Sequence, residues 1–181
     1  MLFTTFSGLK KQEKYSLNKE MNKMNQTKID DPAQIRAIVS NRFIEPGFEY
    51  WFSNHEHIRS PFPKEIRGVL REKTAIVFFE WLEDIKETEL KKMSEDEFVE
   101  MFETILFNEA LKLVDDEDQQ LTISYPFLPR LGDQVNHSEQ GKGEIMERKE
   151  IVSKENKKLF ELKVLSEDTG KTWVTQFELP D

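Results

Sequence analysis

Residues 94–118 read SEDEFVEMFETILFNEALKLVDDED, and this stretch decides the first half of the fold. Ser94 and Glu97 form a capping box, in which the serine side chain binds the Glu97 amide and the glutamate reaches back. Behind it, apolar residues recur every three or four positions, which is the period of an amphipathic helix. They are Phe98, Met101, Phe102, Ile105, Leu106, Ala110, Leu113 and Val114. Four acids at a helix C-terminus would oppose its dipole, so we expect Asp115–Asp118 to lie beyond the last turn.

The segment before this stretch is also predicted to be helical and acidic. Helical spacing of apolar residues across 75–91 predicts one continuous helix. Residues 74–118 hold 15 Asp and Glu against 4 Lys and Arg, a net charge of −11, whereas the whole chain carries −9. We expect the apolar stripe to be core and the acids to face water, either for solubility or as a surface for a basic partner. The nearest basic groups for these acids are in the chain itself: Arg36, Arg42, Arg67 and Arg71.

The N-terminal part divides into three predicted segments. Residues 1–28 are rich in Lys, Asn, Gln and Ser, and they predict a disordered tail. Asp31 and Pro32 suit the cap and first turn of a helix, which we expect to end at Pro46-Gly47. Residues 46–64 combine aromatics, histidines and prolines, and they predict a long loop.

From Gln119 onward the apolar period changes to two, which indicates strands. We predict strands over residues 121–127, 145–152, 159–165 and 172–179, with a turn that places Gly170 at positive φ. The predicted fold is therefore α+β: an N-terminal three-helix region followed by a C-terminal antiparallel β meander of about four strands. The expected boundaries are a tail over 1–28, a helical region over 29–118 and a β region over 119–181, the last two in one integrated domain.

A short motif refines the prediction for the β region. Gly132-Asp133-Gln134-Val135, followed by Gly141-Lys142-Gly143, resembles the opening strand and turn of small SH3-like barrels. The resemblance implies that the meander forms such a barrel, and it implies nothing about function.

The composition excludes several functional classes. The chain of 181 residues has no cysteine, which excludes disulfides, thiolate zinc sites and cysteine nucleophiles. No apolar run approaches the roughly 20 residues of a membrane helix. The net negative charge argues against general affinity for nucleic acid, although residues 1–73 have a net charge of +4. We expect a cytoplasmic protein that needs no cofactor and no membrane.

The aromatic segment is the first candidate site. Tyr50, Trp51 and Phe52, with Arg59 nearby, are predicted to form a protein-binding patch, because Trp, Tyr and Arg dominate interface hot spots. The competing interpretation is that these aromatics anchor the loop to the helices. The preferred hypothesis is a non-enzymatic intracellular interaction or accessory protein, which meets a protein partner through the acidic helical face and this aromatic loop.

The alternative hypothesis is a metal-dependent enzyme. His55 and His57 can project two imidazoles to one side of an extended segment, as metal sites often require. Glu49 lies near them in sequence, and His137 would arrive from the β region. These residues lack a longer motif of fixed spacing, so a pair of surface or packed histidines is the competing interpretation.

Overall fold

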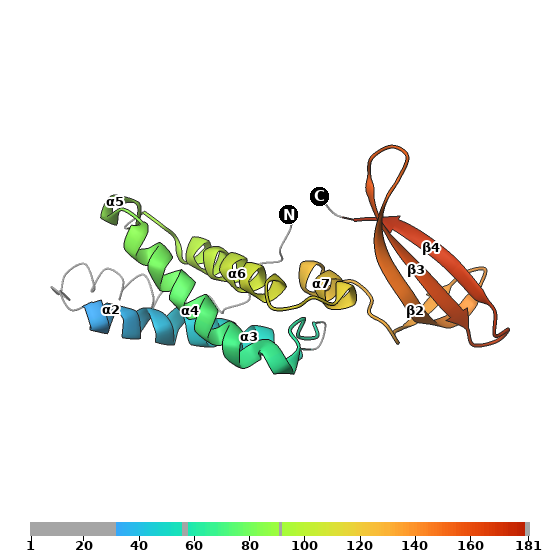
Figure 1. Ribbon diagram of the computed structural model, residues 1–181, viewed down its shortest axis with the longest axis horizontal. Helices are drawn as coiled ribbons and strands as arrows, with labels where there is room; N and C mark the ends of the chain where they lie inside the picture. The colour runs from blue at the N-terminus through green and yellow to red at the C-terminus, as the bar shows by residue number, and fades with distance from the viewer. Residues whose placement is uncertain (1–31, 56–57, 91, 180–181) are drawn as a thin grey trace. The chain divides into compact units, whose positions relative to one another are not determined.

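The computed structural model describes residues 32–55, 58–90 and 92–179. Helices are followed by a four-stranded antiparallel sheet, which confirms the predicted α+β class and the C-terminal meander (Figure 1). The described residues divide into two compact units. The helical unit comprises residues 32–54, 64–90 and 92–113, and the β unit comprises residue 55, residues 58–63 and residues 114–179. The tail predicted over residues 1–28 lies outside the described residues.

The first helical segment continues past the proline at which we expected it to end. α2 (Pro32–Val39) leads into a π-helical turn, η1 (Ser40–Ile44), and then into α3 (Glu45–Phe52). At the end of the π turn the Glu45 N–H donates to the Ser40 carbonyl, five residues back. Pro46 thus falls in the first turn of a new α-helix, where its missing N–H costs little. The loop predicted from residue 46 is therefore wrong for residues 46–52.

Gly47 has a packing reason to be glycine. A Cβ at this position would lie 2.3 Å from Cε1 of Phe102, which no real contact permits. The absence of a side chain therefore lets α3 approach the Phe102 ring closely.

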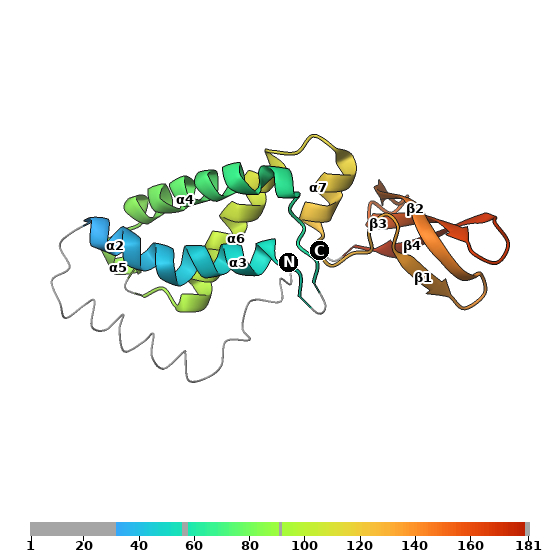
Figure 2. The same cartoon turned by 90° about the horizontal axis from the view of Figure 1, so that it is seen from below.

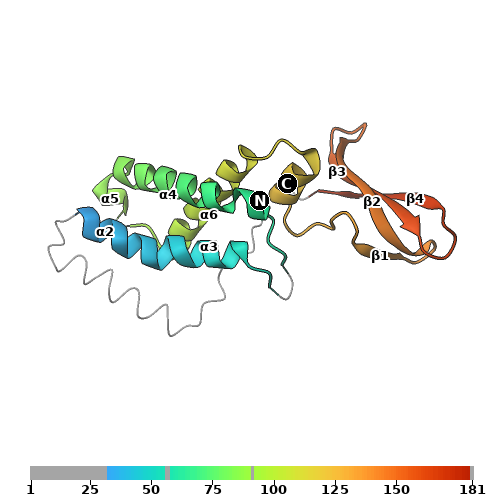
Figure 3. The same cartoon turned by 60° about the horizontal axis from the view of Figure 1, so that its bottom comes forward.

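α4 (Arg67–Asp84) and α6 (Glu95–Leu111) lie side by side in the helical unit (Figures 1 and 3). The 3-10 turn η2 (Lys64–Ile66) precedes α4, and the short α5 (Glu87–Leu90) follows it. The single helix predicted over 75–91 is interrupted at Ile85, whose backbone is extended (ψ 135°). The capping box is confirmed: the Ser94 N–H donates to Glu97 Oε2 (2.6 Å), and the Glu97 N–H donates to Ser94 Oγ (3.3 Å).

The core of the helical unit is largely aromatic. The ring of Phe102 meets Phe48 edge-on at 5.2 Å between centroids and Phe78 at 5.9 Å, and all three side chains are fully buried. Such edge-to-face pairs add about 0.5–1.5 kcal/mol each beyond the burial of area. The other large buried apolar side chains of the unit are Val39, Ile44, Trp51, Leu70, Phe98, Ile105, Leu106 and Phe107.

The four acids at residues 115–118 lie beyond the last turn of α6, as expected, and they also lead into a further helix. α7 spans Glu117–Ser124, and the Asp116 side chain caps it by accepting from the Gln119 N–H at 2.9 Å. Acids in a first turn face the positive end of the helix dipole, so this placement is favourable. The strand predicted over residues 121–127 is therefore wrong. Leu121 and Tyr125, four residues apart, both pack against the core of the β unit, as one helical face allows.

The sheet of the β unit has its strands in sequence order, and all four strands are labelled in Figure 2. They are β1 (Gln134–His137), β2 (Gly141–Val152), β3 (Lys158–Ser166) and β4 (Thr172–Glu178). Gly170 adopts the expected positive φ, 64°, in the β3–β4 turn. The sheet curls into a half-barrel, part of the way toward the closed barrel that the resemblance implied. Its core contains Ile145, Phe160, Leu162, Val164 and Leu179.

A β-bulge changes which residues of β2 face this core. Ile145 pairs with Val164, but Glu147, not Met146, pairs with the next residue, Lys163. The extra residue shifts the alternation by one, so Arg148 lies opposite Leu162 on the core face. A strict period of two from Ile145 would have placed Arg148 on the solvent face.

Candidate functional site

The aromatic segment lies on helix α3 and is partly built into the core. Trp51 is buried, and its Nε1–H donates to Glu103 Oε1 of α6 at 3.0 Å. Its ring also meets Phe107 edge-on at 4.8 Å. A buried tryptophan with a satisfied N–H is an anchor between two helices, so little of Trp51 is presented to a partner.

Tyr50 and Phe52 are half-buried on either side of Trp51. The Tyr50 ring packs edge-on against Trp51, with 5.3 Å between centroids. The Arg67 guanidinium lies over the Phe52 ring at 5.4 Å and donates to the Phe52 carbonyl at 2.7 Å. These contacts correspond to the anchoring interpretation of the aromatic residues, while part of each ring stays accessible.

Glu103 is the unusual polar group beneath this segment. It is only 6% exposed, and this burial raises the pKa of its carboxyl. The nearby charge of Glu100 raises the pKa further, whereas the hydrogen bond from Trp51 lowers it. Burial also raises the pKa of the Tyr50 hydroxyl, and the Glu103 charge raises it further. The helical unit thus contains a carboxyl group whose charged form is disfavoured.

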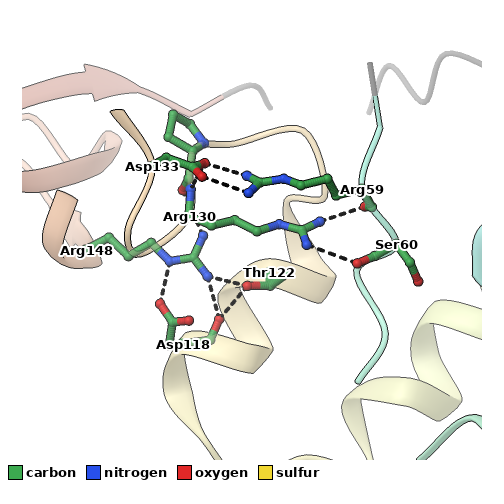
Figure 4. A network of polar contacts seen from close by, with 8 residues as sticks. Arg59, Ser60, Asp118, Thr122, Arg130, Asp133 and Arg148 are labelled. Atoms are coloured by element: carbon green, nitrogen blue, oxygen red, sulfur yellow. Dashed lines mark hydrogen bonds and ion pairs between the residues drawn. The ribbon is translucent and has the colours of Figure 1, made fainter. Parts of the chain in front are cut away.

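Arg59 belongs to the other compact unit, where it binds an aspartate (Figure 4). Its Nη1 donates to Asp133 Oδ1 at 2.7 Å, and its Nη2 donates to Asp133 Oδ2. Burial alone would raise the pKa of Asp133, but the hydrogen bonds from Arg59 and from the Arg130 N–H hold it below the usual value. The predicted combination of Arg59 with Tyr50, Trp51 and Phe52 therefore draws its residues from two separate units.

Two further arginines surround this pair, and we call Arg59, Arg130 and Arg148 the arginine cluster (Figure 4). Arg130 donates to the Ser60 carbonyl at 3.0 Å and to the Arg59 carbonyl at 2.7 Å. Burial lowers the pKa of Arg130, and the charges of Arg59 and Arg148 lower it further. Arg130 therefore ties the segment at residues 58–63 to the chain that leads into β1.

Arg148 is the most buried member of the arginine cluster, with 1% of its side chain exposed. Its Nε donates to Asp118 Oδ1, and its Nη2 donates to the Thr122 hydroxyl and to the Asp118 carbonyl (2.8 Å). Its Nη1 donates to the Pro129 carbonyl at 2.8 Å. The donors are directed at groups of the chain itself, so the cluster joins α7 and the residues before β1 to the sheet.

The residues proposed for a metal site belong to both compact units. His55 is exposed in the β unit, Glu49 is exposed on α3 of the helical unit, and His57 lies outside the described residues. His137 on β1 lies 5.2 Å from the Trp173 ring, and its Nδ1 accepts from the Glu139 N–H at 3.2 Å. Within residues 32–55, 58–90 and 92–179, no three His, Asp or Glu side chains gather closely enough to hold a metal ion.

The outward face of α4 is a surface that sequence analysis missed. Five exposed side chains follow one another at intervals of three and four residues, so they form one stripe along the helix. We call them the α4 stripe: Val69, Glu72, Ile76, Glu80 and Glu83. Val69 is 48% exposed and Ile76 is 58% exposed, whereas Leu70, Thr74 and Phe78 face the core. The helical period of the apolar residues indicates only the buried face. It gives no sign of this exposed face, which combines apolar and charged residues.

Comparison with protein families, curated proteins and solved structures found no match to this chain. None of the helices in the described part of the chain is both long and apolar enough to cross a membrane.

Proposed function

We propose that the chain is a protein-binding protein and that the α4 stripe is its contact surface for a basic partner. The observation that supports this is the pairing of two large exposed apolar side chains, Val69 and Ile76, with three exposed glutamates and one exposed lysine, Lys73, on the same helix face. Exposed apolar groups rimmed by charge are typical of protein contact sites. Of these glutamates, Glu83 binds Arg36 of the same unit, as expected for acids near the chain's own arginines.

The chemistry of the stripe favours an amphipathic basic helix as the partner. Val69 and Ile76 are seven residues apart, so they lie two turns apart on one face and match two apolar anchors of a second helix. The glutamates beside them would attract Lys or Arg that flank those anchors and speed association at low salt. The proposed role is non-enzymatic, in line with the expectation from the sequence.

The test uses a fluorescent synthetic peptide of about 18 residues, with leucines at helical spacing and lysines elsewhere. We expect binding that weakens with salt and that drops about tenfold in Ile76→Lys, because this variant places a cation among the peptide's lysines. Val152→Lys is the matched control. Val152 is an exposed β-branched apolar side chain like Ile76, but it lies in the β unit.

Two charge-reversal variants distinguish binding at the α4 stripe from a general effect of the protein's negative charge. Glu80→Lys should weaken binding more than Glu155→Lys, an exposed glutamate of the β unit that changes the net charge equally. Equal binding of the peptide by all four variants would refute the proposal. So would an NMR titration with the peptide in which the backbone amide signals of α4 do not shift.

A further inference from the structure

Strand β4 has one edge that carries no partner strand in the described structure. It is last in the strand order, and it pairs with β3 alone. The Ser166 N–H donates to the Lys171 carbonyl at 2.9 Å, and the Leu179 N–H donates to the Lys158 carbonyl at 3.1 Å. The odd-numbered residues are therefore the ones bonded to β3, and alternation directs the backbone groups of Thr172, Val174, Gln176 and Glu178 outward.

This edge lacks the features that usually prevent pairing with another strand. Proteins protect edges with lysine, proline, bulges or very short strands. β4 reads TWVTQFE, contains neither lysine nor proline, and keeps an unbroken seven-residue register with β3. β1, at the opposite edge, has four residues only, and β2 carries the bulge. Val174 in the middle of β4 is 56% exposed.

The sequence of β4 is complementary to itself in antiparallel orientation. Pairing all seven residues with a second copy places Thr175 opposite its own equivalent on the two-fold axis. Trp173 then lies opposite Phe177 of the other copy, and Val174 lies opposite Gln176. The one charged residue, Glu178, lies opposite Thr172, so no like charges meet. Aromatic pairs and threonine pairs across strands each contribute about 0.2–1 kcal/mol.

We propose that two copies of this chain associate through β4, which extends the sheet continuously from one copy into the other. The outward-directed groups of the four even-numbered residues supply about eight interstrand hydrogen bonds in this register. A two-fold contact of this kind is closed, so it yields a dimer and not a filament. The surface lies in the β unit, so the proposal stands independently of the one made for the α4 stripe.

The first experiment measures sedimentation over about a hundredfold range of protein concentration. We expect a monomer–dimer equilibrium that Val174→Lys and Val174→Pro each weaken by more than about tenfold. The proline variant removes an N–H that points outward, so the bonds to β3 are kept. Val152→Lys, an exposed valine of a strand away from this edge, should leave the equilibrium unchanged. Circular dichroism verifies that each variant is folded.

The second experiment uses the absence of cysteine from the chain. Thr175→Cys introduces one thiol, which meets its own copy across the two-fold axis. Opposed residues of this non-hydrogen-bonded type have Cα atoms about 4.5 Å apart, within the range of a disulfide. Mild oxidation should therefore produce a covalent dimer quickly with Thr175→Cys and slowly with Val152→Cys. Peptide-level hydrogen exchange of the wild type should also show protection of β4 that rises with concentration.

A chain that stays monomeric throughout the range would overturn the proposal. So would a dimer that Val174→Lys and Val174→Pro do not weaken, or one that Val152→Lys weakens equally. Equal rates of crosslinking by Thr175→Cys and Val152→Cys would exclude the register centred on Thr175.

Discussion

The helical unit and the β unit bury a charged residue in opposite ways. In the helical unit, Glu103 lies beneath the aromatic segment, and the neutral indole N–H of Trp51 is its hydrogen-bond donor. In the β unit, Arg148 is enclosed by a carboxylate, a hydroxyl and two carbonyls. Burial of a charge is costly unless its partners compensate for lost water. The partners of Arg148 therefore compensate its charge, whereas burial disfavours the charged form of Glu103 and raises the pKa of that carboxyl.

The largest effect is expected from removing the buried arginine. Arg148→Met should lower the free energy of unfolding by about 3–5 kcal/mol, because Asp118 and the Pro129 carbonyl lose their donor inside the fold. Urea unfolding monitored by hydrogen exchange of β2 and β3 measures this loss. The matched control is Lys163→Met, which breaks the exposed pair with Glu147 on the other face of the same sheet and should cost under about 1 kcal/mol. Equal losses in the two variants would show that Arg148 has no special role.

A second prediction concerns the close packing of the helical unit. Gly47→Ala should destabilise it by about 1–3 kcal/mol, because the added methyl overlaps the Phe102 ring. Gly68→Ala on α4 is the control, since nothing lies within 4 Å of its Cβ position. Alanine favours a helix over glycine, so this control should stabilise by up to about 1 kcal/mol. Thermal unfolding of both variants measures the contrast, and a Gly47→Ala variant as stable as the wild type would contradict the packing.

The third and smallest effect tests the buried carboxyl. Glu103→Gln keeps an oxygen acceptor for the Trp51 N–H and removes the charge, so it should stabilise the helical unit at neutral pH by about 1 kcal/mol. The folded state holds the Glu103 proton more tightly than the unfolded state, whose pKa is near 4.5. Wild-type stability should therefore fall as pH rises from 4.5 through the raised pKa.

The measurement for this third prediction is urea unfolding of both proteins at several pH values. The advantage of Glu103→Gln should be small below pH 4.5 and grow above it. The control is Glu100→Gln, an exposed glutamate one turn earlier on α6, which should shift stability by less. A Glu103→Gln variant that is less stable than the wild type at neutral pH would show that the charged form is favoured.

Local chemistry in the sequence was enough to predict several elements. The Ser94–Glu97 capping box, the hairpin from β3 to β4 and the positive φ of Gly170 depend on residues close together in the chain. The wrong prediction of a strand over residues 121–127, which overlap α7, had the same local origin. Alternating residues from Leu121 to Phe127 suggested a strand, yet Asp116 caps a helix there, and Leu121 and Tyr125 also satisfy a helical face.

The candidate sites were harder to predict because they depend on long-range contacts. Trp51 and Glu103 are 52 residues apart, and Arg59 and Asp133 are 74 apart. No local pattern indicates which of the many carboxylates these side chains will meet. The exposed stripe on α4 was equally hidden, since the apolar residues Val69 and Ile76 do not by themselves reveal which face of the helix is buried.

Period, capping and turn chemistry act over a few residues, so the α+β class, the acidic character of the helices and most strand positions follow from local patterns. Which side chains face inward depends on contacts between segments that are far apart in the chain. The bulge at Met146 illustrates why: one extra residue in β2 turns Arg148 toward the core. Such a choice reflects pairing between distant strands, since the energy that selects the register comes from contacts with β3 and α7 and not from neighbours along the chain.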